Sequence, residues 1–392
     1  MDRGAAKRLA RYLDECRALV IEEIQRIVPE EQRRELTLYR LMLDYPLREA
    51  KGLRPALCVA TCRALGGKLD AVLQSSAVLE LYHNAFLIHD DIEDESWLRR
   101  GRPTLHREHG VPIAIHVGDA MLALSLQPLL DNMSSIGLGP ALRILEAVAT
   151  MTRQTVHGQA LELDWIRDGA WDLTDADYLR MVELKTAWYS FITPVAVGAI
   201  TARQPRERIG QLSRFALALG LAFQIQDDVL NLRGEEGAYG KEIDGDLWEG
   251  KRTLILLHAM RHMSADERSE ASRILSLPRP PPPGQGDLGC ELASLIDRLE
   301  ASGSLDAPGA AEARATLDRL DPARRRAKTD AEVRWLRARV DEHRSVDYAA
   351  GVARAEAERA GALLDECAPW LPPSPHREVL EGLVGYVVDR VR

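Results

Sequence analysis

Hydrophobic residues recur along the chain at intervals of three and four positions, and stretches with strand-like alternation are scarce. A spacing of three and four places the apolar side chains on one face of a helix. The pattern therefore predicts an all-α protein. With 392 residues, 46% of them hydrophobic, the chain can bury a large core.

Two long apolar stretches each end in paired aspartates. The stretch Val78 to Ile88 leads into a cluster of acids, and the stretch Phe215 to Phe223 leads into a second pair; these acids are Asp90, Asp91, Asp94, Asp227 and Asp228. In a helix, Asp90 and Asp94 lie one turn apart on one face, where like charges repel. A cation would relieve this repulsion, and carboxylate oxygens favour Mg²⁺ or Mn²⁺ over zinc. A single motif is better explained as a solvated acidic helix end, so the metal-site interpretation depends on both motifs.

The longest uncharged stretch runs from Thr186 to Ala202, and Pro194 and Gly198 interrupt it. Its length is marginal for a membrane span, so we expect a buried core helix that opens at Lys185-Thr186. Helices are also expected within residues 1–40, after a capping box at Thr329–Glu332, and from about Ser374 to the C-terminus. We expect no membrane span.

Residues 278–327 open with a proline-rich connector and continue with an Ala-, Arg-, Asp- and Leu-rich segment. Polyproline is extended and stiff, whereas the following composition permits one or two helices. We interpret this segment as a flexible or partly helical insertion. The whole chain, residues 1–392, is then expected to form a single all-α domain.

The formal net charge of -9 disfavours nucleic acid as a partner, and an anionic substrate would need a local basic patch. The five cysteines have no metal-type spacing; they are Cys16, Cys58, Cys62, Cys290 and Cys367. An odd, scattered set of cysteines fits a reducing compartment. The N-terminus lacks an apolar signal-peptide core. These features predict a cytoplasmic protein.

Cationic residues accompany the acidic motifs along the chain, and each group alone could be ordinary surface charge. They are Lys51, Arg54, Arg99, Arg100, Lys185, Lys241 and Lys251. Together with the aspartates they suit a diphosphate, because carboxylates hold Mg²⁺, Mg²⁺ bridges phosphate oxygens and cations take the remaining charge. The apolar stretches before the acids favour a hydrocarbon tail on the ligand.

Several motifs occur in the order found in one known family. They are Lys51-x-x-Arg54-Pro55, His83 before Leu87-Ile88-His89-Asp90-Asp91-x-x-Asp94, Arg99-Arg100-Gly101-x-Pro103, Gly158-Gln159, Lys185-Thr186, Phe223-Gln224-x-x-Asp227-Asp228, and Gly240-Lys241 through Gly250-Lys251. The chain resembles trans-isoprenyl diphosphate synthases of the polyprenyl synthetase family, and most closely the geranylgeranyl diphosphate synthases. The resemblance covers roughly residues 45 to 260, with family-like helices from about 329 to 368.

The resemblance implies an isoprenoid-synthase-type helical bundle with a central apolar cavity, usually a homodimer. It implies Mg²⁺-dependent head-to-tail condensation of isopentenyl diphosphate with an allylic diphosphate, which releases pyrophosphate. Three Mg²⁺ ions, for which Mn²⁺ can substitute, would be held by Asp90, Asp91, Asp94, Asp227 and Asp228. These aspartates, with Lys185 and Lys241, would form the catalytic set.

The resemblance also implies two substrate-binding sets. The allylic diphosphate would contact Arg99, Lys185, Thr186, Gln224, Lys241 and Lys251. Isopentenyl diphosphate would contact Lys51, Arg54, His83 and Arg100. The residues four, five and eight positions before Asp90 are candidates for the floor of the hydrocarbon cavity, namely Phe86, Ala85 and Tyr82. Because Ala85 is small, we expect the C20 product geranylgeranyl diphosphate, with C15 farnesyl diphosphate as the alternative.

The sequence departs from the family pattern near the first lysine, where Glu49-Ala50 replaces a glycine pair and Gly52 replaces a basic residue. Asn231 also stands where the second motif has its last aspartate. Two other functions stay open. A class I terpene cyclase is disfavoured by Asp227-Asp228 and by the Lys51/Arg54 pair, and a non-catalytic partner subunit is disfavoured by the five retained aspartates.

Overall fold

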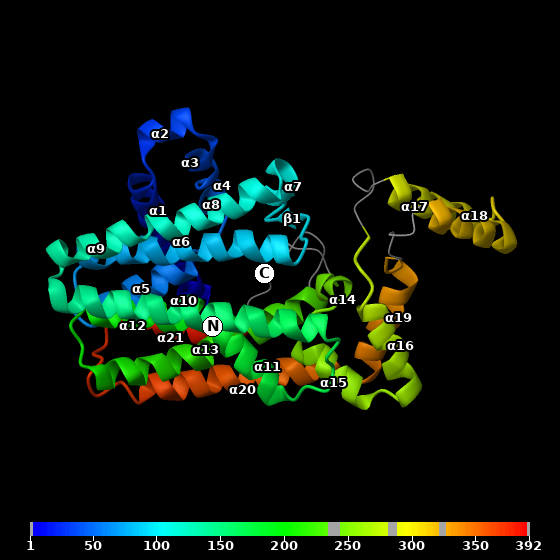
Figure 1. The fold of residues 1–392 in the computed structure, drawn as a ribbon. Helices are drawn as coiled ribbons and strands as arrows, with labels where there is room; N and C mark the ends of the chain where they lie inside the picture. The colour runs from blue at the N-terminus through cyan, green and yellow to red at the C-terminus, as the bar shows by residue number, and fades with distance from the viewer. Residues whose placement is uncertain (1–2, 234–243, 281–287, 321–326, 390–392) are drawn as a thin grey trace.

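The computed structural model describes residues 3–233, 244–280, 288–320 and 327–389 and is almost entirely helical (Figure 1). The first half contains α1 (Arg3–Ile27), α2 (Glu30–Glu35), α3 (Thr37–Leu41), α4 (Asp44–Leu47), α5 (Leu53–Ala64), α6 (Leu69–Glu93), α7 (Leu105–His109), α8 (Val111–Leu124), α9 (Leu126–Ser135), α10 (Leu138–Arg167), α11 (Asp175–Val182), the π-helix η1 (Glu183–Ile192) and α12 (Thr193–Thr201). The second half contains α13 (Arg206–Arg233), α14 (Gly245–Glu249), α15 (Leu254–His262), α16 (Ala265–Leu275), α17 (Leu288–Ala301), α18 (Ala307–Leu320), α19 (Asp330–Glu342), α20 (Ser345–Asp365) and α21 (Pro375–Asp389). The predicted all-α class is confirmed.

The described strands form one short antiparallel ribbon, in which β1 (Leu98–Arg99) pairs with β2 (Arg102–Pro103). The two residues of its turn both have positive φ, 53° at Arg100 and 72° at Gly101. Tight hairpins favour such turns because their twist matches that of the strands. Arg100 is therefore held in a backbone conformation that non-glycine residues rarely adopt.

The long helices pack side by side into a bundle with an apolar interior (Figure 1). Helix α13 packs along α20 and η1, α10 packs along η1, and α5 packs against both α6 and α12. Every residue of α12 is buried, which confirms the prediction of a core helix within Thr186–Ala202. The core therefore surrounds the helices that carry the acidic motifs.

The expected start of this core helix at Lys185-Thr186 is wrong. The helical segment begins at Asp175, where the Thr174 hydroxyl accepts from the Asp177 N–H and the Asp177 carboxylate accepts from the Thr174 N–H. This capping box satisfies free N–H groups at the helix start. Lys185 consequently lies inside a helix, and η1 continues from α11 into α12 without a break.

Helices α17 and α18 pack against each other and form the described part of the insertion. Figure 1 shows this pair projecting away from the bundle. At its base the Lys328 N–H donates to the Pro278 carbonyl over 2.9 Å, so the ends of the insertion meet. The capping box at Thr329–Glu332 is confirmed as the start of α19. The helices α17 and α18 lie within this segment, whereas its interpretation as an insertion and the single-domain organisation stay predictions.

Among the described residues, one helical stretch has the length and apolar composition of a membrane span. It runs from Val111 to Ser135, and 39% of its most apolar window is buried inside the protein. Helices α8 and α9 divide it at Ser125, whose hydroxyl donates to the Met121 carbonyl. The stretch considered from the sequence, Thr186–Ala202, is instead part of the core.

Candidate active site

The first acidic motif lies at the C-terminal end of α6. Asp90 and Asp91 belong to its last turn, and Asp94 follows the last helical residue, with its N–H donating to the Asp90 carbonyl over 2.8 Å. The predicted one-turn separation of Asp90 and Asp94 is therefore confirmed. Asp91 is fully buried. Carboxylates placed this deeply need partners, because burial disfavours their charged form.

Each of these aspartates has a cationic partner. Lys185 Nζ lies 3.1 Å from Asp90 Oδ1 and also contacts Glu162. Arg99 Nε donates to Asp91 Oδ1 over 3.0 Å, and Lys251 Nζ lies 2.9 Å from Asp94 Oδ2. The structure thus brings Lys185 and Lys251, which are distant in sequence, together with the first motif and with Arg99, which follows the motif closely.

The balance of burial and charge sets the protonation of this cluster. Burial acts to raise the pKa of Asp90, but Lys185, Lys251 and Arg99 outweigh it and the pKa is lowered. For Asp94, burial outweighs the attraction of Lys251 and raises the pKa to about 7. Burial acts to lower the pKa of Lys185, but Asp90 and Glu162 raise it overall. Near neutral pH, Asp90 and Lys185 are charged and Asp94 is close to its titration midpoint.

The second motif lies near the C-terminal end of α13. Asp228 accepts from the Tyr178 hydroxyl over 2.6 Å and from Gln224 Nε2 over 2.9 Å. Burial raises the pKa of Asp228 to about 6. Asp227 is half-buried on the same helix.

The π-helix η1 links the two motifs. Lys185 reaches Asp90 of the first motif, and the next residue, Thr186, donates to Gln224, which donates to Asp228 of the second. A π-helix is rare and is often found at functional sites. Two neighbouring residues of one helix therefore contact both acidic motifs.

Helix α10 approaches η1 closely at Gly158. A Cβ atom on Gly158 would lie 2.2 Å from the Lys185 backbone nitrogen, which is too close for any side chain. The Gly158-Gln159 motif is explained by this approach, together with a hydrogen bond of 2.5 Å from Gln159 Nε2 to Glu93. The glycine allows Glu162, one turn further along α10, to reach Lys185.

A second group of cations lies beside the first motif. Arg54 donates to Ser190 Oγ over 2.7 Å, and its guanidinium lies 4.8 Å from the ring centre of Tyr189. His83 stacks on the same tyrosine, with ring centres 5.7 Å apart. Burial first, then the charges of Arg54, Arg100 and Arg99, lower the pKa of His83 well below its ordinary value. A neutral histidine thus lies among arginines.

Arg100 and Lys51 approach this region from other segments. Arg100 Nη1 donates to the Tyr45 carbonyl over 3.2 Å. Lys51 is exposed, with Nζ 5.9 Å from the ring centre of Tyr386 on the C-terminal helix α21. The structure therefore groups Arg54, His83 and Arg100 more tightly than Lys51. Lys241 lies outside the described residues.

Asn231 has a structural role. Its backbone carbonyl accepts from the Asp244 N–H over 2.9 Å, and its side-chain Oδ1 accepts from the Asp246 N–H over 3.0 Å. These bonds fix the start of α14, which leads to Lys251. The amide at this position orders the segment that delivers a lysine to the site.

The candidate floor residues separate into two groups. Tyr82 and Phe86 are in edge contact, with ring centres 6.0 Å apart, and Phe86 also contacts Tyr189 at 5.6 Å. Ala85 is fully buried in a different apolar cluster, which includes Met121 of α8. Only Tyr82 and Phe86 therefore lie together on the side of α6 that faces η1.

Sequence reasoning missed four residues that the structure places at the site. Glu162 lies three residues after the Gly158-Gln159 motif, but its pairing with Lys185 had no signal in the sequence. Tyr45 and Tyr178 are isolated aromatic residues, Tyr189 lies between Trp188 and Phe191, and all three resemble ordinary core positions. Only tertiary packing brings their hydroxyls and rings to the charged residues.

The donor set fits Mg²⁺ with a diphosphate. Asp90 Oδ1 is buried, with Lys185 Nζ 3.1 Å away, and all the candidate ligands are carboxylates. Within the described ranges, no three His, Cys, Asp or Glu side chains converge on one metal position. Mg²⁺ is typically held by one or two carboxylates and completed by phosphate oxygens and water. Both oxygens of Asp91 already accept from Arg99 or Tyr45, and both oxygens of Asp228 already accept from Tyr178 or Gln224. These two residues are therefore the less available ligands.

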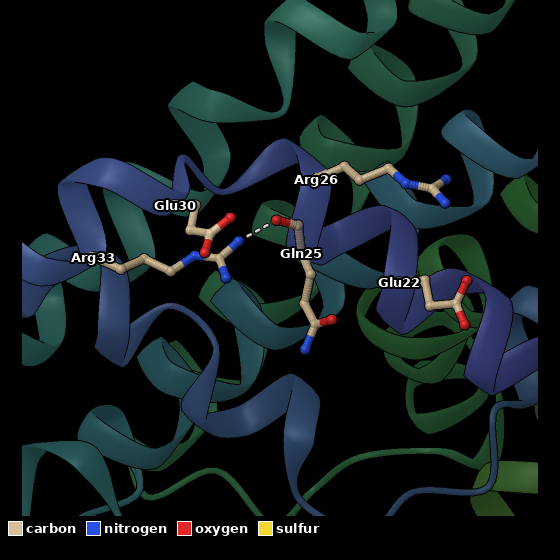
Figure 2. A pocket seen from close by; sticks show the side chains of 5 residues that line it. All are labelled: Glu22, Gln25, Arg26, Glu30 and Arg33. Atoms are coloured by element: carbon tan, nitrogen blue, oxygen red, sulfur yellow. Dashed lines mark hydrogen bonds between the residues drawn. The ribbon is translucent and has the colours of Figure 1, made fainter.

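A separate surface hollow lies at the N-terminal helices and is lined by Glu22, Gln25, Arg26, Glu30 and Arg33 (Figure 2). Within it, Arg33 donates to the Gln25 carbonyl. It contains none of the residues singled out from the sequence. Its charges of both signs define no ligand, so the candidate site remains the acidic cluster.

Comparison with known proteins agrees with the fold. The polyprenyl synthetase family model matches residues 36–281. The chain is 32% identical over 218 residues to a geranylgeranyl diphosphate synthase of Saccharolobus solfataricus, covering 56% of this chain and 65% of that protein. It is 30% identical over 318 residues to a short chain isoprenyl diphosphate synthase of Methanothermobacter thermautotrophicus, covering 80% and 91%. An octaprenyl diphosphate synthase of Escherichia coli is 29% identical over 342 residues, covering 87% and 86%.

Solved structures share the whole architecture. Geranylgeranyl pyrophosphate synthetase from Pyrococcus horikoshii has a TM-score of 0.76 and 27% identity, covering 98% of this chain and 99% of that one. Polyprenyl synthase from Caulobacter crescentus, complexed with calcium and isoprenyl diphosphate, has a TM-score of 0.74 and 26% identity, covering 98% of each chain. The chain belongs to the polyprenyl synthetase family. It is an isoprenyl diphosphate synthase by class, and thus a transferase.

Proposed function

We propose that this protein catalyses the Mg²⁺-dependent head-to-tail condensation of isopentenyl diphosphate with an allylic diphosphate and makes mainly geranylgeranyl diphosphate. The observation that carries the proposal is the pairing of two acidic motifs through Lys185 and Thr186, beside a group of cations. Acids for a metal, cations for phosphate and an apolar helix behind them are the parts this reaction requires. The Caulobacter relative binds calcium and isoprenyl diphosphate, which supports a divalent ion here.

In this proposal Asp90, Asp94 and Asp227 hold the metal, with Asp91 and Asp228 completing the acidic set. Bound Mg²⁺ supplies electrostatic stabilisation of the departing pyrophosphate. Lys185, Lys251 and Arg99 take further negative charge as the allylic carbon–oxygen bond breaks, and Gln224, Thr186 and Lys241 bind the same substrate. The buried placement strengthens these interactions, because the local dielectric constant is low.

The second substrate would lie at Arg54, His83, Arg100 and Lys51. The arginines suit bidentate binding of a diphosphate. Tyr189 contacts both Arg54 and His83 on one side and Phe86 on the other. The isopentenyl double bond would thus be held between the cation group and the hydrocarbon wall, where it would attack the allylic carbon as the carbon–oxygen bond breaks. The resulting cation would then lose a proton to the departing pyrophosphate.

A product assay tests this function. Purified protein, isopentenyl diphosphate, an allylic primer and Mg²⁺ should give mainly a C20 diphosphate by chromatography, and chelation of the metal should stop the reaction. Absence of any prenyl product under saturating Mg²⁺ would contradict the proposed reaction. A C15 or octaprenyl main product would leave the reaction intact and contradict the chain length.

Phe86 is expected to limit product length. Replacing Phe86 by alanine should raise the proportion of products longer than C20 about tenfold, because a change of ~1.4 kcal/mol in relative barriers is sufficient. Phe86→Leu, which keeps most of the volume, is the matched control and should change the distribution less. An unchanged distribution in Phe86→Ala would show that the tail runs elsewhere.

Ala85→Phe separates the two candidate positions. Ala85 is fully buried against α8, so a phenyl ring there should destabilise the fold by ~1–3 kcal/mol. Shortening of the product in this variant would place Ala85 at the floor of the cavity. A lower melting temperature with an unchanged product would assign chain length to Phe86 and Tyr82 alone.

We propose a homodimer that buries an apolar surface on α8, α9 and α10. The exposed residues of this surface are Val111, Ile113, Ile115, Leu126, Leu130, Met133, Leu138, Leu142 and Val156. Exposed apolar residues in this number on neighbouring helices favour an association site. Light scattering should give twice the molar mass of one chain. A dimer covered in this way is consistent with the cytoplasmic location expected from the sequence.

A further inference from the structure

The second aspartate of each acidic pair accepts a hydrogen bond from a buried tyrosine. Tyr45 donates its hydroxyl proton to Asp91 Oδ2 over 2.5 Å, and Tyr178 donates to Asp228 Oδ2 over 2.6 Å. Both tyrosines are 1% exposed. They come from α4 and α11, far apart in sequence, so the two motifs share one arrangement although different helices build it.

Tyr45 belongs to a rigid frame around the first motif. Its hydroxyl oxygen also accepts from the Leu105 N–H over 3.3 Å at the start of α7. The Arg48 guanidinium lies 4.4 Å from the centre of the Tyr45 ring and donates to the carbonyls of Arg99 and Pro103, each over 2.8 Å. Tyr45 thus connects Asp91 to the ribbon that carries Arg99.

Tyr178 has the equivalent place at the second motif. It lies one turn after the capping box that begins α11. Asp228 accepts from Tyr178 on Oδ2 and from Gln224 on Oδ1, so both oxygens have a fixed donor. Gln224 in turn accepts from Thr186. The carboxylate plane of Asp228 is therefore set by two helices.

We propose that Tyr45 and Tyr178 are positioning residues that orient the second aspartate of each pair and so keep the whole acidic motif in the arrangement that binds the metal. The carboxylate interacts with each tyrosine through its hydroxyl group, which donates the hydrogen bond. A phenylalanine would fill nearly the same core volume without this donor. Groups that hold a metal-binding carboxylate through a hydrogen bond commonly change metal affinity or activity 10–100-fold when removed. The inference rests on the proposed metal-dependent function.

The test removes only the two hydroxyl groups. Tyr45→Phe and Tyr178→Phe are compared with Tyr12→Phe. The Tyr12 hydroxyl is hydrogen-bonded to His376 Nδ1 at a distance of 3.0 Å, and neither residue belongs to the acidic motifs. The measurement is the rise in melting temperature with Mg²⁺ at fixed inorganic pyrophosphate, since a ligand that binds the folded state stabilises it. The Mg²⁺ concentration at half-maximal rise should increase about tenfold or more in Tyr45→Phe and Tyr178→Phe. It should not change in Tyr12→Phe.

The same titration gives activity as a second readout. Excess Mg²⁺ should restore much of the lost turnover if the hydroxyls act on the metal site. Lower melting temperatures with an unchanged Mg²⁺ midpoint would overturn the proposal and leave the reaction standing. If the melting temperature of the wild-type protein does not rise with Mg²⁺ and pyrophosphate, both this proposal and the proposed metal-dependent function are overturned. Because the tyrosines lie in separate parts of the fold, each variant tests the proposal by itself. If neither variant folds, the tyrosines are structural residues and the proposal is overturned.

Discussion

Asp90→Ala and Asp227→Ala are each expected to lower turnover by about 10²-fold or more while the protein stays folded. Metal ions contribute several kcal/mol to stabilising developing charge, and each 1.4 kcal/mol corresponds to a factor of ten in rate. The two residues lie on α6 and α13, so loss at either should interrupt the same reaction. Steady-state rates at saturating Mg²⁺ and substrates provide the measurement.

The fold should tolerate these substitutions for a physical reason. Lys185 keeps Glu162 as a partner when Asp90 is removed, so no buried cation is left unpaired. Asp365→Ala, on the exposed surface of α20, is the matched control and should retain wild-type turnover. Near-normal rates in either Asp90→Ala or Asp227→Ala would remove these aspartates from the catalytic set.

Asp94→Asn is expected to stabilise the metal-free protein at pH 8. Burial raises the pKa of Asp94 from 3.8 to about 7, so the folded protein favours the neutral carboxyl. The stability that this group contributes is fully present below pH 3.8 and is lost as pH rises through about 7. At pH 8 the charged Asp94 carboxylate therefore lowers the free energy of unfolding by ~2–4 kcal/mol. Asparagine carries no charge and avoids this loss. Lys251 retains Glu249 at 2.8 Å in the variant.

Denaturant unfolding in a metal chelator checks this expectation between pH 4 and pH 8. The difference in unfolding free energy between Asp94→Asn and wild type should grow with pH and level off above about 7. Asp365→Asn should show no such growth. A constant difference across the range would mean that Asp94 has no raised pKa. Mg²⁺ with pyrophosphate should reverse the order, because wild type retains the carboxylate that the ion requires.

The sequence by itself determined the helical class and the chemical type of the site. Apolar spacing of three and four is imposed by helix geometry, so it survives in any packing of the helices. Carboxylates and cations in family order likewise indicated a site for a metal and a diphosphate, and Asp90, Lys185 and Lys251 do lie together in the structure. The capping box before α19 was also readable, because its bonds lie within four residues.

Only the tertiary structure decided which groups share a face. The close packing of Gly158 against the Lys185 backbone brings α10 to the π-helix that contains Lys185. Ala85 and Phe86 are neighbours in sequence but lie in different apolar clusters, because adjacent helical residues point about 100° apart. Tyr45 and Tyr178 reach their aspartates across 46 and 50 residues, a contact that no local pattern encodes. The order of residues shows which chemical groups are close together along the chain. The packing of distant segments determines which partner a buried group has.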